Sequence, residues 1–419
     1  MSLTFLFMPE SAYGPTNNSL GVGDILRRRG HRVVFAAEAS WKGKLEALGF
    51  EEDLVDLAPP AEEEQDPGQF WKDFIRETAP EYRKSTLEQQ ETVTKPIWEG
   101  LIDGAKYCEA QLKAIIERVN PDVIIEDNVL TFPALLTSGK KFVRIVSCQP
   151  LEIRGGNIPP VFSGLPAADR SGWDAFDAEY ERTHRELWTA YNEWCVEQGT
   201  APLPDLEFIH EGDLNLYVYP EILDYDRPLG PTWHRLDSSV RETEEDFTLP
   251  FERNEGALIY FSLGSLGSSD VELMQRVIDV LATTPHQVIV SKGPLHEEIK
   301  LADNMWGAEF LPQTKIIPQC DLVITHGGNN TTTEALHFGK PMILLPLFWD
   351  QYDNAQRVDE LGYGVRLSTY AFTDEELKGA VERLLGDTEL RARLAAAGEE
   401  IRRRDGLRKA ADLIEQLGQ

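Results

Sequence analysis

The chain has 419 residues, of which 71 are acidic and 41 basic, and its formal net charge is -30. Such an excess of acidic side chains argues against a broad basic surface, so we expect no nucleic-acid partner and no membrane partner. The content of 42% hydrophobic and 27% charged residues is typical of globular proteins, and the length predicts two domains of about 200 residues each.

A strand-helix-strand unit opens the chain. The N-terminal sequence MSLTFLFMPESAYG lacks a basic segment and its apolar run is too short for a signal peptide, so it predicts a first strand at 3–8. A loop at 9–18 precedes a helix at 19–29 that closes at Gly30, and a second strand follows at 32–37. No later stretch reaches transmembrane length, so we expect a cytoplasmic protein.

Helical and strand-like segments alternate through the rest of the first half. A helical stretch rich in aromatic and charged residues spans about 70–118, and buried strands are predicted at 122–126, 142–147 and 214–220. Between 155 and 200 the chain is irregular and then helical. The aromatic residues there either belong to the core or line a ligand pocket: Trp173, Phe176, Tyr180, Trp188, Tyr191 and Trp194.

Prolines, glycines and charges cluster between 224 and 256, so we place an interdomain linker at 226–250. A second strand-helix series follows, in which ALIYFS, QVIVSKG, DLVITHGG and PMILLPLF each contain one predicted strand. The alternation predicts an α/β fold with two doubly wound parallel sheets, one domain at 1–225 and the other at 251–395. We expect an Ala, Leu, Arg and Glu-rich helical segment at 396–419, interrupted near Gly406, to cross back onto the first domain.

A glycine-bearing turn joins the predicted strand at 321–325 to a helix that opens at Thr331. This turn, HGGNN, exposes backbone amides at the positive end of a helix dipole, and its glycines permit close approach, which favours phosphate oxygens. No Lys or Arg occurs between 322 and 338, so the turn is not a P-loop. A plainer interpretation remains open, because Thr331 and Glu334 have the spacing of an ordinary capping box.

Cysteine and histidine spacing gives no sign of a metal site. The four cysteines lack the paired spacing of zinc sites or disulfide scaffolds, and we expect them to be reduced and buried: Cys108, Cys148, Cys195 and Cys320. No pair of histidines has metal-ligand spacing with a third partner. We therefore expect no bound metal.

Within 310–365 the motifs PQ, HGG-N, E, GxPM, P and DQ-x-x-N follow one another. Their order and spacing resemble the donor-binding signature of the family 1 nucleotide-sugar glycosyltransferases, which include plant, mammalian and bacterial macrolide or other antibiotic-pathway enzymes. A weaker likeness spans nearly the whole chain and is poorest between 50 and 214. The resemblance implies the GT-B fold, in which two Rossmann-like domains face a central cleft, with the acceptor on the N-terminal side and the donor on the C-terminal side.

The same resemblance implies a role for individual donor-site residues. In chain order these are Ser265 near the phosphates, Gln313 at the base, His326, Gly328, Asn330 and Thr331 around the diphosphate with Asn329 in the same turn, Glu334 at the ribose, and Asp350 and Gln351 at the sugar hydroxyls. A carboxylate and an amide after a buried strand also suit adjacent hydroxyls of a hexose on physical grounds. Helix-end amides and His326 would stabilise the departing diphosphate, so no cofactor or metal is implied.

The sequence departs from the family at the catalytic base. The family's Gly-His pair falls on Gly14 and Pro15, and proline cannot accept a proton. Three explanations remain open. A carboxylate with a raised pKa replaces the histidine, with Asp127 preferred to Glu126 and Glu10; or the acceptor is acidic enough, as a phenol or carboxylic acid is, to need no strong base; or the protein binds a nucleotide sugar without transferring it efficiently.

The acceptor site is predicted from the first loop. Tyr13, Asn17 and Asn18 are candidates to line it, although Asn18 or Ser19 could instead cap the first helix. We expect the protein to transfer a hexose, with inversion, from a UDP-glucose-like donor to a small natural-product acceptor with an aromatic or polyketide-like aglycone. A dTDP-sugar is the alternative donor. The alternatives are a sugar-nucleotide epimerase and a nucleotide-sugar-binding auxiliary protein, and no sequence feature indicates an oligomeric state.

Overall fold

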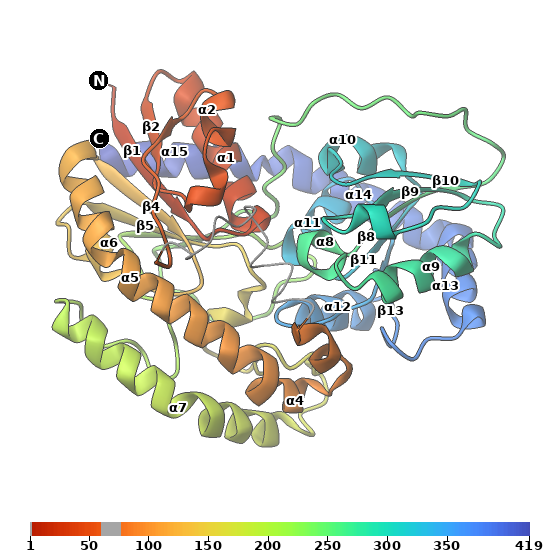
Figure 1. Ribbon diagram of the computed structural model, residues 1–419, viewed down its shortest axis with the longest axis horizontal. Helices are drawn as coiled ribbons and strands as arrows, with labels where there is room; N and C mark the ends of the chain where they lie inside the picture. The colour runs from red at the N-terminus through yellow and green to blue at the C-terminus, as the bar shows by residue number, and fades with distance from the viewer. Residues whose placement is uncertain (1, 60–76) are drawn as a thin grey trace.

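Two parallel sheets organise the chain in the computed structural model, which describes residues 2–59 and 77–419 (Figure 1). The first sheet has seven strands in the order β3-β2-β1-β4-β5-β6-β7, and the second has six in the order β10-β9-β8-β11-β12-β13. Every strand pair within them is parallel. This topology confirms the predicted α/β class with two doubly wound sheets.

The first sheet and its helices are built from the first half of the chain. The strands are β1 (Thr4–Pro9), β2 (Arg32–Phe35), β3 (Glu51–Glu52), β4 (Val123–Asp127), β5 (Lys141–Val146), β6 (Leu214–Tyr217) and β7 (Trp233–Arg235). The helices are α1 (Tyr13–Arg28), α2 (Lys44–Ala47), α4 (Thr86–Gln89), α5 (Lys95–Val119), α6 (Pro133–Leu136) and α7 (Trp173–Glu197), with a π-helical turn at Gln90–Thr94. The first residues of the helical stretch predicted at 70–118 lie outside the described residues.

The second sheet and the closing helices follow. The strands are β8 (Leu258–Ser262), β9 (Gln287–Ser291), β10 (Met305–Ala308), β11 (Leu322–Thr325), β12 (Met342–Leu344) and β13 (Gly364–Arg366). The helices are α8 (Gly264–Gly267), α9 (Val271–Leu281), α10 (Gln313–Ile316), α11 (Asn329–His337), α12 (Gln351–Glu360), α13 (Asp374–Gly386), α14 (Thr388–Arg404) and α15 (Gly406–Gly418).

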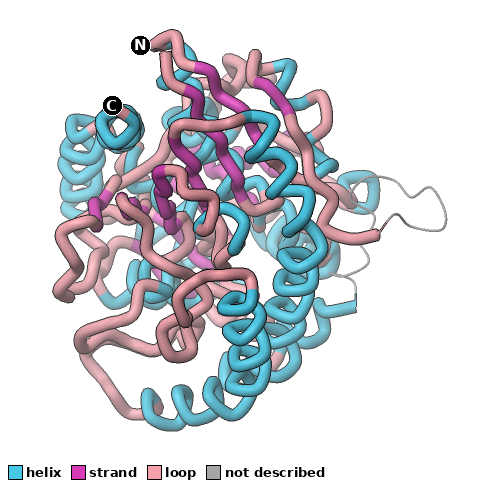
Figure 2. Tube along the Cα trace, turned by 90° about the vertical axis from the view of Figure 1, so that its left-hand side faces the viewer, coloured by secondary structure: helices cyan, strands magenta, loops and turns pink. Residues whose placement is uncertain are grey.

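The alternation of side chains along β1 shows why the first sheet needs helices on both faces. Phe5 and Phe7 pack with apolar residues of α1 and α15, whereas Leu6 and Met8 point the other way and pack with α5. Successive strand residues face opposite sides, so a strand that is apolar at every position must be covered twice. Figure 2 shows the strands lying between these helices.

Helix α1 begins earlier than the sequence predicts. It starts at Tyr13, with Ala12 as its N-cap residue, and not at Ser19. Pro15 therefore lies in the first turn, where a missing N–H costs nothing and the fixed φ of proline suits the helix. The prediction that Asn18 or Ser19 caps this helix is wrong, because both lie inside it.

The segment between the sheets does more than connect them. Strand β7, inside the stretch 226–250 that we predicted as a linker, pairs with β6 and extends the first sheet. The predicted interruption of the helical segment at 396–419 is confirmed, because α14 and α15 are divided at Asp405, whose φ of 46° places it in the left-handed region. Helix α15 then lies against α1, where a Cβ on Gly21 would be 2.9 Å from Leu407, so a larger residue at position 21 would displace the Leu407 side chain.

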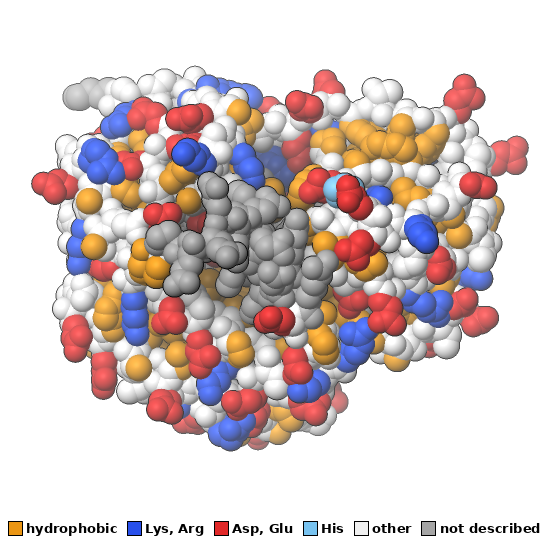
Figure 3. All heavy atoms as spheres, in the orientation of Figure 1, with side chains coloured by type: hydrophobic (Ala, Val, Ile, Leu, Met, Phe, Trp, Pro, Cys, Tyr) orange, Lys and Arg blue, Asp and Glu red, His pale blue; other side chains and the backbone are white. Residues whose placement is uncertain are grey.

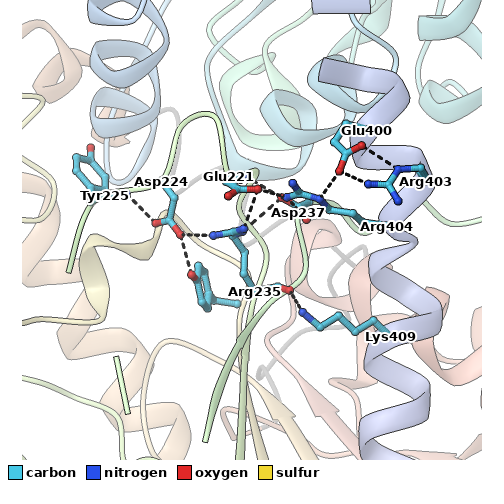
Figure 4. Close-up of polar contacts among 10 residues, drawn as sticks. Glu221, Asp224, Tyr225, Arg235, Asp237, Glu400, Arg403, Arg404 and Lys409 are labelled. Atoms are coloured by element: carbon cyan, nitrogen blue, oxygen red, sulfur yellow. Dashed lines mark hydrogen bonds and ion pairs between the residues drawn. The ribbon is translucent and has the colours of Figure 1, made fainter. Parts of the chain in front are cut away.

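A network of charged side chains fastens α14 and α15 to the end of the first sheet (Figure 4). Arg404 pairs with Glu221, Asp237 and Glu400, and Arg235 pairs with the first two of these. The Lys409 ammonium donates to the Arg235 carbonyl over 2.8 Å. The network holds both crossing helices at the point where the chain passes between the domains.

The distribution of charged side chains on the surface is consistent with the net negative charge of the sequence. On the face in Figure 3, acidic side chains are interspersed with basic ones over both domains. Of the cysteines, Cys108, Cys195 and Cys320 are free and buried as predicted, whereas Cys148 is only partly buried. In the part of the chain that the structure describes, no helix is long and apolar enough to cross a membrane.

Candidate active site

Each sheet has a point at which the strand order reverses, and the two points face the same cleft. In the first sheet it lies between β1 and β4, beyond which stand Glu10 and Asp127. In the second it lies between β8 and β11, beyond which stand Gly264 and His326. Ligands of doubly wound sheets bind at such points, beyond the carboxyl ends of the strands.

The start of α11 touches the start of α1 across this cleft. The Asn18 amide donates to Asn330 Oδ1 over 3.1 Å, and the Asn330 amide donates to the Gly14 carbonyl over 3.0 Å. Two helix N-termini, neither capped by a side chain and each with a positive dipole end, therefore meet in one place. Such an arrangement favours an anion between them.

The His326 imidazole is enclosed by two glycines. A Cβ on Gly264 would lie 2.7 Å from His326 Nε2, and one on Gly328 would lie 2.6 Å from it. The ring's Nδ1 is 3.2 Å from the Thr325 hydroxyl. Burial lowers the pKa of His326 to about 4, so the imidazole is neutral at pH 7 and has one N–H to donate.

The capping-box interpretation of α11 is wrong. The helix begins at Asn329 and no side chain caps it, so its first amides are free for a ligand. Glu334 turns away from those amides. Its carboxylate accepts from the Arg241 guanidinium over 3.0 Å and from the Gln313 amide.

A buried hydrogen-bond network surrounds the residues that are predicted to bind the nucleotide base and the ribose of the donor. Gln313 also donates to the Thr331 hydroxyl over 3.2 Å and accepts from the Tyr260 hydroxyl over 3.1 Å. Arg241 bonds Glu244, whose other oxygen accepts from the Thr314 N–H and hydroxyl over 2.8 and 2.6 Å. Arg241 was missed from the sequence because it lies in the predicted linker, far from the motif that it supports.

Asn329 holds the two domains together. Its side-chain amide donates to the Ser147 and Val218 carbonyls, both over 2.8 Å, and the residue is 5% exposed. With both N–H groups engaged, this side chain has no donor left for a phosphate. The structure therefore separates Asn329 from the residues of the same turn that are predicted to bind the diphosphate.

We expect Asn329→Ala to lower the free energy of unfolding by about 2–3 kcal/mol, because two buried carbonyls lose their donor. Denaturant unfolding measures this change. The exposed Asn157 is a matched control, and Asn157→Ala should change stability by less than about 0.5 kcal/mol. Unchanged stability in Asn329→Ala, together with weakened nucleotide binding, would instead return Asn329 to the diphosphate site.

The predicted sugar-binding pair lies at the end of the second sheet facing the first domain. Asp350 is 7% exposed and accepts from the Gln149 N–H over 3.0 Å, and burial raises its pKa to about 7. Gln351 Oε1 accepts from the Leu347 N–H over 3.0 Å, which leaves its NH₂ group free to donate. Ser265 lies in α8, partly exposed, directly after Gly264.

The candidate bases differ in their surroundings. Glu126 pairs with Arg144 over 2.9 Å, and both side chains are 0% exposed. The Arg144 guanidinium stabilises the charged form of Glu126 and so weakens it as a base, and Asp127 remains the preferred candidate. Asp127 accepts from the Ser147 hydroxyl over 2.7 Å through Oδ1, whereas its Oδ2 is buried without a partner. Burial, and secondarily the charge of Glu10, raise the pKa of Asp127 well above its usual range.

Two further carboxylates face this site and were not singled out from the sequence. Glu152 follows β5, and burial near Asp350 and Asp353 raises its pKa. Asp353 accepts from the Phe162 and Gly164 N–H groups over 2.6 and 2.8 Å, across the domain boundary. Burial raises the pKa of Asp353 to about 8.

The predicted acceptor residues do not share one surface. The Tyr13 ring lies 5.6 Å from that of Phe310 in the second domain and 5.2 Å from that of Trp41. Asn18 is bonded to Asn330, and Asn17 is partly buried in α1. Tyr13 thus lies close to the PQ motif, on the donor side of the cleft.

Comparison with known proteins agrees with this geometry. The family described as Erythromycin biosynthesis protein CIII-like, C-terminal domain, matches residues 275–405. NDP-glycosyltransferase YjiC of Bacillus subtilis (strain 168) is 25% identical over 96% of this chain and 94% of its own length. Demethyllactenocin mycarosyltransferase of Streptomyces fradiae is 24% identical over 99% of this chain and 86% of its own. The chain is a glycosyltransferase, similar to the family 1 enzymes.

Solved structures share the fold of this glycosyltransferase along its whole length. The glycotransferase of kitacinnamycin superposes with a TM-score of 0.72 at 21% identity and covers 100% of both chains. VinC, solved in complex with dTDP, superposes with a TM-score of 0.68 at 18% identity and covers 99% of each chain. The GT-B fold of the glycosyltransferase is thereby confirmed.

Proposed function

We propose that this glycosyltransferase moves a hexose from a nucleotide-diphosphate sugar to a small natural-product acceptor, with inversion at the anomeric carbon. The observation that carries the proposal is the facing pair of strand-reversal points. One presents a buried carboxylate oxygen without a partner on Asp127, and the other presents the free amides of α11 beside neutral His326. A base and an anion site on opposite walls of one cleft suit a direct displacement.

The chemistry follows from these groups. The acceptor hydroxyl gives its proton to Asp127 Oδ2 while its oxygen forms a bond to the anomeric carbon. The bond from that carbon to the diphosphate oxygen breaks, and the electron pair leaves with the nucleotide diphosphate. Helix-end amides and the His326 N–H stabilise the departing charge, and Asp350 with Gln351 holds the sugar hydroxyls. No resident cofactor or metal takes part in these steps.

The proposed donor and the proposed acceptor rest on different observations. UDP-glucose-like donors suit the hydroxyl-binding Asp350 and Gln351, and dTDP-sugars are the second choice. An aromatic or polyketide-like acceptor is supported by relatives such as the oleandomycin glycosyltransferase of Streptomyces antibioticus, which is 25% identical over 97% of this chain. Phenols need less help from a base than aliphatic alcohols do, which suits a site that lacks histidine at position 15.

The test is a panel of UDP- and dTDP-sugars against phenolic, carboxylic and aliphatic alcohol acceptors, read as nucleotide diphosphate released and glycoside formed. We expect nucleotide diphosphate and glycoside to form in equal amounts, and only when both a donor and an acceptor are present. Donor binding without release would identify a binding protein. Conversion of the donor to its epimer without an acceptor would identify an epimerase.

A further inference from the structure

Helix α12 lies on the side of the second domain that faces the first, and a buried carboxylate fastens it there (Figure 1). Asp353 Oδ2 accepts from the Phe162 N–H over 2.6 Å, and its Oδ1 accepts from the Gly164 N–H over 2.8 Å. The residue is 2% exposed, so little water competes for these bonds. A deprotonated carboxyl accepts on both oxygens, and hydrogen bonds to a charged acceptor are the stronger ones.

The turn at 160–164, which Asp353 holds, has a strained backbone. Phe162 has a φ of 67° and Gly164 has one of 59°. A bulky residue rarely adopts a left-handed conformation, and it keeps that conformation only where the surrounding contacts enforce it. The two hydrogen bonds to Asp353 are such contacts, because their donors are the N–H groups of the left-handed residues themselves. The conformation of this turn of the first domain therefore depends on a side chain of the second.

Two more side chains of the second domain hold the same part of the chain. Arg366 of β13 donates to the Gly164 carbonyl over 2.9 Å. Glu360, near the end of α12, accepts from the Ala167 N–H over 3.0 Å. A Cβ on Gly164 would lie 2.9 Å from Tyr352 Cβ, so the turn also packs closely against the helix. Backbone groups of the first domain thus take their partners from the second, which fixes the spacing between α12 and the turn.

The helix that is held in this way also carries the residues proposed to bind the sugar. Asp350 and Gln351 stand at the start of α12, and Asp353 follows within its first turn. Residues three positions apart lie on one face of a helix, so Asp350 and Asp353 both face the first domain. Asp127, the proposed base, ends β4 of that domain. The contacts of Asp353 therefore help to set the distance between the bound sugar and the base.

We propose that Asp353 is a positioning residue for the transfer: its contacts with the turn at 160–164 hold the sugar-binding end of α12 against the first domain and keep water from the anomeric carbon. This rests on the proposed function, which supplies the sugar and the base. Direct displacement requires reacting atoms about 3–3.5 Å apart, and a misplacement of about 1 Å costs about 100-fold in rate.

The expected sign of lost positioning is hydrolysis of the donor. Without Asp353 the strained turn relaxes, the contact between the domains loosens, and water competes with the acceptor. The water oxygen then bonds to the anomeric carbon and gives its proton to solvent, while the nucleotide diphosphate leaves with the electron pair of the broken bond. Free sugar forms in place of glycoside. The ratio of the two products does not depend on how much of a variant is folded, so a merely structural role would leave it unchanged.

The test compares wild type, Asp353→Ala, Asp353→Asn and the control Asp359→Asn. Asp359 lies on the same helix and also accepts from a backbone N–H, that of Arg366, but within the second domain. Free sugar and glycoside are measured at about pH 9, where Asp353, whose pKa is about 8, is charged. We expect the ratio of free sugar to glycoside to rise about tenfold in Asp353→Ala and less in Asp353→Asn, which keeps one acceptor oxygen. Asp359→Asn should match wild type, and all four proteins should bind nucleotide diphosphate equally.

Amide hydrogen exchange at 160–167 gives a second readout that needs no catalysis. We expect faster exchange in Asp353→Ala than in wild type and no change in Asp359→Asn. An unchanged product ratio in Asp353→Ala overturns the positioning role, even if the overall rate falls. If Asp353→Ala does not fold, an unchanged ratio in Asp353→Asn overturns it equally. No glycoside from wild type with any donor and acceptor would contradict the proposed transfer, and amide exchange would then still decide whether Asp353 holds the turn.

Discussion

Replacement of Asp127 by asparagine is expected to lower kcat for aliphatic alcohol acceptors by about 10²–10³-fold, the usual contribution of a general base. The reason is the position of its carboxylate. Oδ1 is held by Ser147 over 2.7 Å, and the unpartnered Oδ2 is left to take a proton. Asparagine keeps the shape of the side chain but cannot accept that proton. Phenols, which ionise more readily, should lose less.

The pH dependence gives a second readout of the same group. Burial raises the pKa of Asp127, so the carboxyl is protonated and inactive at low pH and becomes a base as the pH rises through that pKa. We expect kcat/KM to show this acid limb and Asp127→Asn to lose it. The Ser147 hydrogen bond lowers the pKa of Asp127, so Ser147→Ala should move the limb to higher pH. Full activity and an unshifted limb in Asp127→Asn would rule out the carboxylate base.

His326→Ala is expected to lower kcat by about 10²–10³-fold with every acceptor, because the leaving diphosphate loses a donor that is already in place. Since the pKa of His326 is about 4, the ring is neutral and the loss should be the same between about pH 6 and 8. The loss of kcat in His326→Ala should not depend on the acidity of the acceptor, whereas the loss in Asp127→Asn should. An effect confined to aliphatic alcohols would show that His326 acts on the acceptor.

Gly328→Ala tests the same position without removing the imidazole. The added Cβ would stand 2.6 Å from His326 Nε2, so the ring must leave its present position. We expect a loss of about tenfold in kcat, which corresponds to about 1.4 kcal/mol in transition-state stabilisation. Gly379→Ala is the matched control, because a Cβ at this position in α13 meets nothing within 4 Å. Equal rates for both variants would show that the position of the ring is unimportant.

Much of the fold could be predicted from local patterns. The apolar runs that became β4, β8 and β11 are buried on both faces, which is why they contain no polar alternation and are easy to find. The start of α1 was missed because Gly14, Pro15 and two asparagines are typical of a loop. Contact with α11 across the cleft outweighs these local preferences.

The side-chain contacts of the site were harder to predict, because they join residues from distant parts of the chain. Glu334 has the spacing of a capping residue, yet it bonds Arg241 in the preceding linker region. Asn329 belongs to the phosphate-type turn by sequence, but its amide is taken by Ser147 and Val218. No local pattern encodes such contacts, so a motif identifies the location of the cleft but not which side chains remain free within it.

The stereochemistry of the product tests the central claim, that one displacement in this cleft moves the sugar from nucleotide to acceptor. Wild type is given UDP-α-glucose, or the best donor from the panel, with its best acceptor, and the anomeric proton coupling of the glycoside is read by NMR alongside the diphosphate released. We expect an anomeric configuration opposite to that of the donor, which is a β-glycoside from UDP-α-glucose, formed in equal amount with the diphosphate. A glycoside that keeps the donor's anomeric configuration would contradict a single displacement, and diphosphate release without any glycoside would contradict transfer itself.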